Sequence, residues 1–451
     1  MASGSRLSAH RQAQHLKRPE SDPGGEVTSP HHRQVTGAAP GSTEPPAHPS
    51  RRSLRGLDWF IFFVADVQTG FGPFISVYLT TQKWTQVDIG IVLSVGGIIA
   101  LLAQMPGGAI VDATRSERLV AGIALCVIAA SALAYASWPI FSVVLGAAAM
   151  HAMASAVLGP CIVALSLGLV GHAALGERLG RNARFAALGN GIAAAAMGTV
   201  GYFFAPRAVF FVTAILLVPT LIALHRIRSS EVDATRAHGG IPHVPPDKTL
   251  SDVPALVFKR PLLILAGCVM LFHLANAAML PLMGSVMTMR SSESAPLLIA
   301  LCIIVPQFIV ALIAPWVGRQ ALVWGSRTFV LVAFASLILR TLLFATVTNS
   351  YFIPVVQILD GITAASIGVM VPLIIADLTR GTGRFNLAQG IVGTFVGIGS
   401  AASPTLGGYV TDHFGSQAAF LGLGAIAVFG FCAVLMFLPE TRPRSRASSS
   451  S

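Results

Sequence analysis

The sequence predicts an all-α membrane protein with twelve transmembrane helices in two six-helix bundles, and with cytoplasmic N- and C-termini. Apolar residues make up 54% of the chain and charged residues only 11%. A soluble domain usually has about a quarter charged residues. The apolar residues form long continuous stretches, which predict helices rather than the short alternating strands of a β-barrel.

Twelve stretches are long and apolar enough to cross a bilayer, which takes about 20 residues of helix. The first six are expected at approximately 57–81, 88–111, 119–137, 139–170, 185–205 and 207–225. The second six are expected at approximately 261–289, 296–318, 328–348, 351–377, 386–411 and 416–438.

These spans divide the chain into five parts. Residues 1–56 are rich in Ser, Pro, His, Arg and Gly and have no apolar run. Because such a segment cannot bury enough surface to offset its chain entropy, we expect a disordered cytoplasmic tail. The other four parts are a six-helix bundle (57–228), a cytoplasmic linker (229–259), a second bundle (260–440) and a cytoplasmic tail (441–451).

Lys and Arg residues predict the orientation, because cytoplasmic loops carry an excess of them. With the N-terminus inside, the inner loops and linker hold fifteen of these residues and the outer loops hold three. We therefore expect a multi-pass protein of the cell inner (plasma) membrane. The fifteen are Arg115, Arg118, Arg178, Arg181, Arg184, Arg226, Arg228, Arg236, Lys248, Lys259, Arg260, Arg319, Arg327, Arg380 and Arg384, and the three are Lys83, Arg207 and Arg290.

A short repeat supports the division into two halves. Arg184-Phe185 and Arg384-Phe385 each follow a basic segment, expected to be a loop, and each begins a glycine-rich apolar stretch, the fifth span of its half. Small residues allow helix backbones to approach closely. In the eleventh span we expect Gly397, Pro404 and Gly407 to permit packing and bending, as Gly72 and Pro73 would in the first.

The chain resembles the major facilitator superfamily over about residues 57–442. The family combines six plus six spans with a long cytoplasmic linker, and its second and third spans are joined by a loop of the form G-x-x-x-D-R-x-G-R-R. Here Gly108, Asp112, Arg115 and Arg118 match the glycine, the acid and the basic character, while Ala113 departs from the pattern. Pro439-Glu440-Thr441-Arg442 is similar to an ending that is frequent in the family.

Asp112 is expected at a helix end that faces the cytoplasm. A carboxylate there can accept hydrogen bonds from the N-terminus of a neighbouring helix. If that contact forms in one conformation and breaks in another, the Gly108–Arg118 segment works as a conformational latch. The alternative is an ordinary solvated loop charge.

Ionisable residues inside spans are costly and should face a cavity or a partner. The exceptions here are Asp66, His151, His273, Arg340 and Asp360. The resemblance implies that spans 1, 4, 7 and 10 line the central cavity, and four of the five residues fall on those spans.

The candidate proton-coupling or substrate groups are four of these residues, Asp66, His151, His273 and Asp360, together with Asn276. Burial raises the pKa of a carboxyl group, so Asp66 is expected to couple protons or bind substrate; the alternative is a structural hydrogen bond. Arg340 and Asp360 lie at comparable depth and form an ion pair candidate, although Asp360 could also contact substrate. His151 and His273 are either cavity groups or core histidines, and Asn276 lies three residues beyond His273, on its face.

We interpret the chain as a secondary transporter that exports a small organic solute by proton-coupled alternating access. A facilitator or importer of a metabolite is one alternative, and a non-transporting receptor with the same fold is another. Antiporters of the family often carry a Gly-Pro pattern in span 5, which here has no proline before Pro206. The expected partners are the solute, protons and the bilayer, with a monomeric chain and no nucleic acid. No enzyme motif is present, and we expect no cofactor and no metal.

Overall fold

The computed structural model describes residues 49–69, 75, 78–79, 81–114, 116–205, 207–240, 259–290 and 295–440. The described residues are helical, without a strand. In the first half the helices are α1 (Arg51–Thr69), α3 (Gln86–Ala113), α4 (Glu117–Ser137), α5 (Phe141–Phe203) and α6 (Ala208–Arg226). The linker contributes η1 (Ser229–Glu231) and α7 (Ala234–Ala237). The second half has α9 (Arg260–Asn276), α10 (Met279–Arg290), α11 (Ala295–Trp324), α12 (Ser326–Thr346), η2 (Ser350–Phe352), α13 (Ile353–Val356), α14 (Ile358–Leu378) and α15 (Phe385–Phe437).

Nine helical segments of the described chain are long and apolar enough to cross a membrane. Two of them, within α5 and α15, are far longer than the roughly 20 residues that a bilayer needs. Each contains one glycine with a positive φ, Gly171 at 70° and Gly415 at 83°, where one helix ends and the next begins. Counting these as two helices each, nine segments become eleven. The first predicted span begins as α1 and runs into residues described only in part, so twelve spans stay a prediction.

The helix α1 begins at Arg51, so residues 51–56 are helical rather than part of a disordered tail. The Oγ of Ser50 accepts a hydrogen bond from the Ser53 amide at 3.2 Å, which caps the helix. The Ser50 amide donates to Glu231 Oε2 at 2.9 Å. Burial raises the pKa of Glu231, but hydrogen bonds from Ser50 and Ser53 and the nearby charge of Arg228 outweigh it and hold the pKa below its usual range.

The basic segment before the fifth predicted span is also helical, which corrects its expected assignment as a loop. The helix resumes directly after Gly171, so Arg178, Arg181 and Arg184 lie on α5. Asp58 of α1 explains why this charged segment stays folded. Its carboxylate pairs with Arg178 at 2.7 Å and with Arg181 at 2.6 Å.

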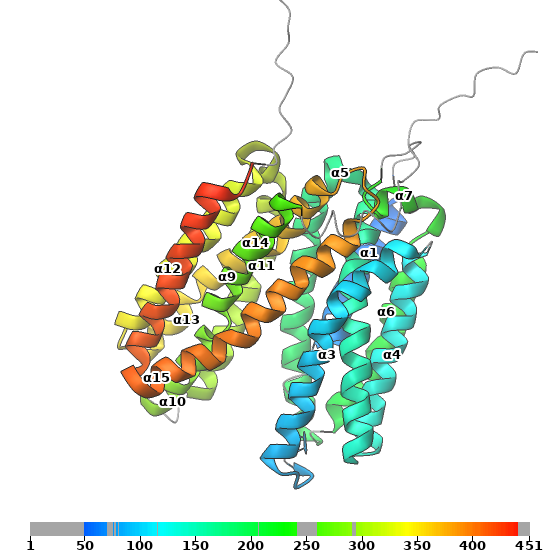
Figure 1. Ribbon diagram of the computed structural model, residues 1–451. Coiled ribbons are helices and arrows are strands. Elements are labelled where there is room, and N and C mark those ends of the chain that lie inside the picture. The colour runs from blue at the N-terminus through cyan, green and yellow to red at the C-terminus, as the bar shows by residue number, and fades with distance from the viewer. Residues whose placement is uncertain are drawn as a thin grey trace, which may run out of the picture. The chain divides into compact units, whose positions relative to one another are not determined.

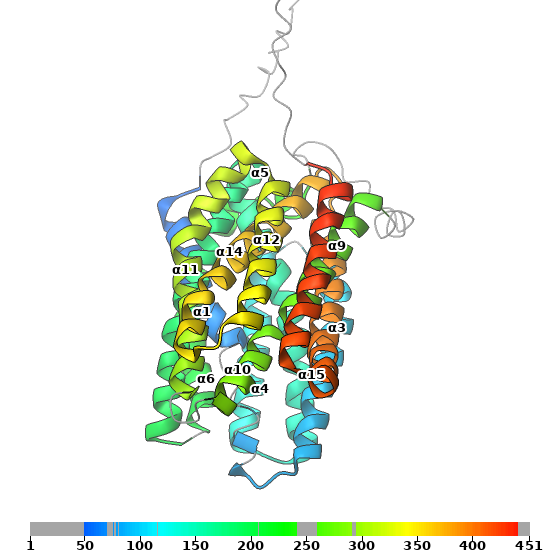
Figure 2. The same cartoon turned by 90° about the vertical axis from the view of Figure 1, so that its left-hand side faces the viewer.

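The helices of His48–Ser451 pack in two groups that are joined by several helix pairs. Figure 1 shows α3, α4 and α6 gathered on one side and α9, α12 and α15 on the other. The most extensive connections between the groups are α5 with α11 and α3 with α15, and α5 also contacts α14 and α15. Figure 2 shows α15 alongside both α9 and α3.

Glycines permit the closest of these contacts. On α5 and α11, Gly176 and Gly318 face each other so closely that a Cβ on either would overlap the other's carbonyl oxygen. A Cβ on Gly390 of α15 would overlap the Gln104 carbonyl of α3. Both contacts lie toward the end of the helices that carries the linker residues 227–240, which we call the linker end.

Gly399 tests whether close packing inside the second group holds this fold together. An alanine Cβ at 399 would overlap the Met270 carbonyl oxygen of α9, whereas one at Gly422, on the same helix α15, would meet nothing within 4 Å. Overpacking costs about 1–3 kcal/mol. Gly399→Ala should therefore lower the thermal unfolding midpoint in detergent, while Gly422→Ala should leave it unchanged or raise it. Equal midpoints for the two variants would contradict this packing.

Candidate functional site: polar clusters at the linker end and within the helices

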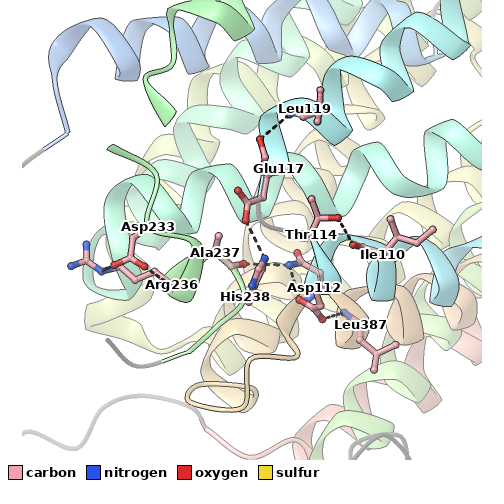
Figure 3. Close-up of polar contacts among 12 residues, drawn as sticks. Ile110, Asp112, Thr114, Glu117, Leu119, Asp233, Arg236, Ala237, His238 and Leu387 are labelled. Atoms are coloured by element: carbon pink, nitrogen blue, oxygen red, sulfur yellow. Dashed lines mark hydrogen bonds and ion pairs between the residues drawn. The ribbon is translucent and has the colours of Figure 1, made fainter. Parts of the chain in front are cut away.

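Asp112, at the C-terminal end of α3, accepts hydrogen bonds from the N-terminus of α15. Its Oδ1 accepts from the Asn386 side-chain amide at 2.9 Å and from the Asn386 backbone amide at 3.2 Å. Its Oδ2 accepts from the Leu387 amide at 2.7 Å (Figure 3). The first backbone amides of a helix lack partners within the helix, and its N-terminus carries a partial positive charge. The carboxylate satisfies both needs across the two halves of the chain.

The linker residues complete this cluster. His238 Nε2 lies 3.1 Å from Glu117 Oε1 at the start of α4 (Figure 3). The backbone carbonyl of His238 accepts from the Phe385 amide at 3.2 Å, and the Ala237 carbonyl accepts from the Asn386 side chain at 3.3 Å. One short segment therefore contacts both the α3–α4 turn and the start of α15.

The sequence-predicted latch residues separate into two groups. Gly108 belongs with Asp112, because a Cβ on it would overlap the Asn386 carbonyl and hold α3 away from α15. Arg118 instead points to α6, where it donates to the His225 carbonyl at 3.5 Å. Arg115 lies outside the described residues.

A second cluster lies within the second half and joins three helices. Arg340 of α12 forms an ion pair with Asp360 of α14 through Nη1 and donates through Nη2 to the Asn276 Oδ1 of α9. The Arg340 side chain is 2% exposed and that of Asp360 26%. The arginine is therefore enclosed, while its carboxylate partner remains partly open to the space beside the helices.

The seventh predicted span is broken beside this cluster. The expected continuous helix over 261–289 is instead α9 and α10, and α9 ends at Asn276. The break is stabilised by Ser403 of α15, whose Oγ accepts a hydrogen bond from the Ala278 amide at 2.9 Å. Interrupted helices expose backbone polar groups at a fixed place, which suits them to binding sites within the membrane.

The first half holds a smaller polar cluster. His151 Nε2 lies 3.4 Å from the hydroxyl of Ser155, one turn along α5, and Gln68 of α1 donates to the Ser155 carbonyl at 3.2 Å. Asp66 is two residues before Gln68 on α1, and its side chain is not among those described. Among described residues, no hydrogen bond joins His273 to Asn276, Arg340 or Asp360; its ring lies edge-on to Phe272 at 5.4 Å.

The expected packing residues of α15 lie at helix contacts. A Cβ on Gly397 would meet Leu101 of α3, and one on Gly407 would meet Ala278 beside the break. Pro404 lies inside α15, next to the Ser403 that bonds Ala278. Gly72 and Pro73 lie outside the described residues.

Sequence reasoning missed several members of these clusters. Asn386, Glu117 and His238 are polar residues at helix ends or in the linker, where polar residues are ordinary. Gln68 and Ser155 are uncharged, so the rarity of ionisable groups within spans does not single them out. The available signal was their position: Asn386 directly follows the repeated Arg-Phe pair, and Gln68 follows Asp66 by two residues.

The enclosed Arg340 predicts a non-additive response to mutation. Removing one partner of a buried ion pair costs about 3–5 kcal/mol, whereas removing both costs much less. Because Asp360 is partly exposed, we expect Arg340→Leu and Asp360→Leu each to cost about 2 kcal/mol and the double variant to cost less than their sum.

Thermal unfolding of the four proteins in detergent, treated as a double-mutant cycle, measures this coupling. Arg228→Leu is the control, because Arg228 pairs with Glu231 while 54% exposed. It should change the stability by less than about 0.5 kcal/mol. Additive single effects would show that the Arg340–Asp360 pair contributes no coupling.

The chain is similar to known proteins over nearly its whole length. The profile of the Major Facilitator Superfamily matches residues 58–347 and 296–451. Two uncharacterised MFS-type transporters of Mycobacterium tuberculosis, from strains CDC 1551 / Oshkosh and H37Rv, are each 39% identical over 411 residues, covering 88% of this chain and 96% of their own.

A solved structure shares the fold. The human organic anion transporter MFSD10 aligns with a TM-score of 0.63 at 15% identity, over 87% of this chain and 100% of its own. Together with the family profile and the mycobacterial relatives, this confirms the resemblance seen in the sequence: the chain belongs to the Major Facilitator Superfamily of membrane transporters.

Proposed function

We propose that this chain exports a small organic solute in exchange for protons, by opening a central site to one side of the membrane at a time. Family membership supports transport. The observation that carries the coupling part of the proposal is the Arg340–Asp360 pair, a charged contact between helices that meet a third, interrupted helix at Asn276. Charged groups at this depth are costly and are retained where they serve a pathway or a partner.

The linker-end contacts support a conformation closed on that side. Asp112 binds the start of α15, and the Gly176–Gly318 contact brings α5 against α11. Arg184 Nε adds a hydrogen bond to the Ala311 carbonyl of α11 at 2.7 Å. Alternating access requires these contacts between the two halves to break in the opposite state. In this proposal Asp112 is the latch, because its partners belong to the other half.

Asp360 and Asp66 are the proposed proton-binding groups. Protonation of Asp360 would cancel its attraction for Arg340 and free Nη1 of the guanidinium to bind a solute, while Nη2 already donates to Asn276. Asp66 would act in the first half, near the Gln68–Ser155–His151 cluster on α1 and α5. A proton taken up on either carboxylate favours one arrangement of the helices over the other, which is the thermodynamic requirement for coupling.

Two other functions remain as alternatives. A facilitator or importer would use the same closed linker end without exporting its solute against a proton gradient. A receptor that keeps the fold would bind a solute without moving it. The first test therefore measures solute movement and proton movement together, and it includes anionic compounds because the human structural neighbour carries organic anions.

Proton coupling can be measured in inside-out vesicles with an imposed pH gradient, acid inside. With the wild type, one member of a panel of cationic, neutral and anionic compounds should accumulate and dissipate the gradient. Asp360→Asn and Asp66→Asn should reduce the dissipation to that of vesicles without the protein. Asp88→Asn, which removes a carboxylate from the first turn of α3, is the matched control and should behave as the wild type.

The outcomes separate the three functions. Movement that is equal in wild type and variants and independent of the gradient would identify a facilitator. Uptake only from the opposite face would identify an importer. Binding of a compound without any movement would favour the receptor.

The latch can be tested through the conformational equilibrium. Asp112→Asn keeps the shape but loses the charge that accepts three hydrogen bonds from Asn386 and Leu387. A hydrogen bond to a charged group contributes about 1.5–3 kcal/mol, so the closed population should fall about tenfold or more relative to the open one.

Spin labels can be placed at the exposed positions Ser230 and Arg319 in a background without the native cysteines. Double electron–electron resonance would then report opening of the linker end as a longer distance between the two labels. Asp233→Asn is the control, because its carboxylate lies on the same end but bonds the Arg236 amide of its own short helix at 3.0 Å. Identical distance distributions for wild type and Asp112→Asn would remove the latch from the proposal.

A further inference from the structure

One face of α1 carries basic residues followed by aromatic ones. Arg51, Arg55 and Trp59 are spaced four residues apart, so they share one side of the helix. Phe62 and Phe63 continue this side, and the ring of Trp59 stacks on that of Phe63 with their centroids 5.9 Å apart. Trp59 is 50% exposed, and Arg51 and Arg55 are exposed as well. The order runs from charged groups at the linker end to aromatic groups one and two turns further along.

The neighbouring face of α5 repeats this order. Arg181 lies over the Phe185 ring, one turn further on, with 5.4 Å between its Cζ and the ring centroid. Phe185 meets Trp59 of α1 with ring centroids 6.3 Å apart. Both helices therefore present arginines at the linker end and aromatic rings below them. Such an order suits the boundary between headgroups and acyl chains.

A cavity of about 530 Å³ opens between the two helices at the level of the arginines. Its lining combines four guanidinium groups, two carboxylates and apolar side chains. The lining residues are Pro49, Arg51, Leu54, Arg55, Asp58, Val170, Ala174, Glu177, Arg178 and Arg181.

The lining of the cavity carries more positive than negative charge. Asp58 is taken by Arg178 and Arg181, its Oδ1 receiving Arg178 Nη2 and Arg181 Nε at 2.7 and 2.8 Å. Among the described residues, no ion pair joins Arg51 or Arg55 to a carboxylate. Glu177, the second carboxylate of the lining, adds its negative charge beside Arg181. The four guanidinium groups still outnumber the two carboxylates, and among the described residues Arg51 and Arg55 line the cavity without an ion-pair partner.

We propose that this cavity binds the phosphate of an anionic phospholipid in the leaflet at the linker end, with Arg51 and Arg55 on the phosphate and the acyl chains along Trp59, Phe63 and Phe185. Basic pockets between transmembrane helices are suited to anionic headgroups, and guanidinium groups bind phosphate oxygens in pairs. A phosphate in solution shares the headgroup chemistry. The aromatic faces directly below the arginines favour the lipid, because an inorganic ion would gain nothing from them.

The site would have a structural consequence for transport. Its lipid would bridge α1 and the Gly171–Phe203 part of α5, which is the helix that packs on α11 across the two halves. A membrane rich in anionic lipid would then stabilise the packing of α1 on α5, and the proposed closed conformation of the linker end depends on that packing. The lipid site lies outside the proposed solute pathway, so it does not depend on which solute is carried.

Native mass spectrometry of the delipidated full-length protein tests the site, with phosphatidylglycerol and phosphatidylcholine titrated separately. Each arginine near a membrane surface contributes a few-fold to several-fold in affinity for anionic lipid, so R51Q/R55Q should weaken the first phosphatidylglycerol-binding step about 10- to 30-fold. The R51K/R55K variant keeps the charge but loses the paired donors, so its affinity should lie between those of the wild type and R51Q/R55Q. Phosphatidylcholine should bind both proteins equally.

Two further variants separate this site from other causes. R260Q/R319Q removes two exposed arginines from the linker end outside the cavity, and it should bind phosphatidylglycerol as the wild type does. Trp59→Ala should weaken phosphatidylglycerol binding, and millimolar inorganic phosphate should not displace the lipid. An equal loss of phosphatidylglycerol affinity in R51Q/R55Q and R260Q/R319Q would show that the lipid responds to the overall positive charge and not to this cavity. If inorganic phosphate displaces phosphatidylglycerol and Trp59→Ala does not change its affinity, the cavity is a site for a soluble anion and the lipid assignment is wrong.

Discussion

A bilayer offers no water to backbone amides and carbonyls, so each must be bonded by the chain itself. This constraint explains why the spans are helical and why an interruption inside a span needs a hydrogen-bonding partner. At Gly171 and Gly415 the chain turns through a positive φ that glycine adopts at little cost. Between α9 and α10 the break leaves the Ala278 amide, and Ser403 of α15 accepts its hydrogen bond. The break therefore depends on a neighbouring helix, and it holds Asn276 at a defined place beside Arg340 and Asp360.

The same constraint governs the charges, because each enclosed carboxylate needs a partner, and the partners differ in kind. Asp58 is neutralised by Arg178 and Arg181 between helices of one half. Asp112 is neutralised by the amides of a helix from the other half. Asp360 is neutralised by an arginine that is more enclosed than itself. The first arrangement stabilises a bundle. The second can exist only while the halves touch, and the third leaves the carboxylate accessible enough to exchange its partner. Conformational change and coupling are therefore best sought at the second and third.

The sequence predicts the general architecture and the ionisable residues within it, because composition, span length and the rarity of intramembrane charge are local properties. Arg340 and Asp360 could be paired from the sequence since their positions along opposite-running spans imply a similar depth. Asn386 and His238 could not be placed at Asp112 in this way, because the contact depends on how α15 and the linker pack against α3. The basic segment 172–184 was predicted as a loop for a related reason. Its charges suggest solvent, and only the neighbouring α1 reveals Asp58, which neutralises two of its arginines inside a continuous helix.

The two halves close the linker end by different means, although their sequences repeat. Phe385 begins α15, and the amides that follow it are free to bind Asp112. Phe185, its counterpart, lies well inside α5, where the helix that begins after Gly171 has already bonded those amides. An acid near Gly318 of α11 would find no helix N-terminus to bind, so a counterpart of Asp112 would gain no such hydrogen bonds there. Between α5 and α11, the two halves are held together by the close packing of Gly176 on Gly318 and by the hydrogen bond from Arg184 to the Ala311 carbonyl. The contact of Asp112 with the start of α15 is charged and directional, and one proton or one competing cation can break it. The contact between Gly176 and Gly318 carries no charge, so the helices there can only slide or separate. In the proposed transport cycle, the Asp112 contact is therefore the one that protonation can release, and the linker segment at His238 lies against it.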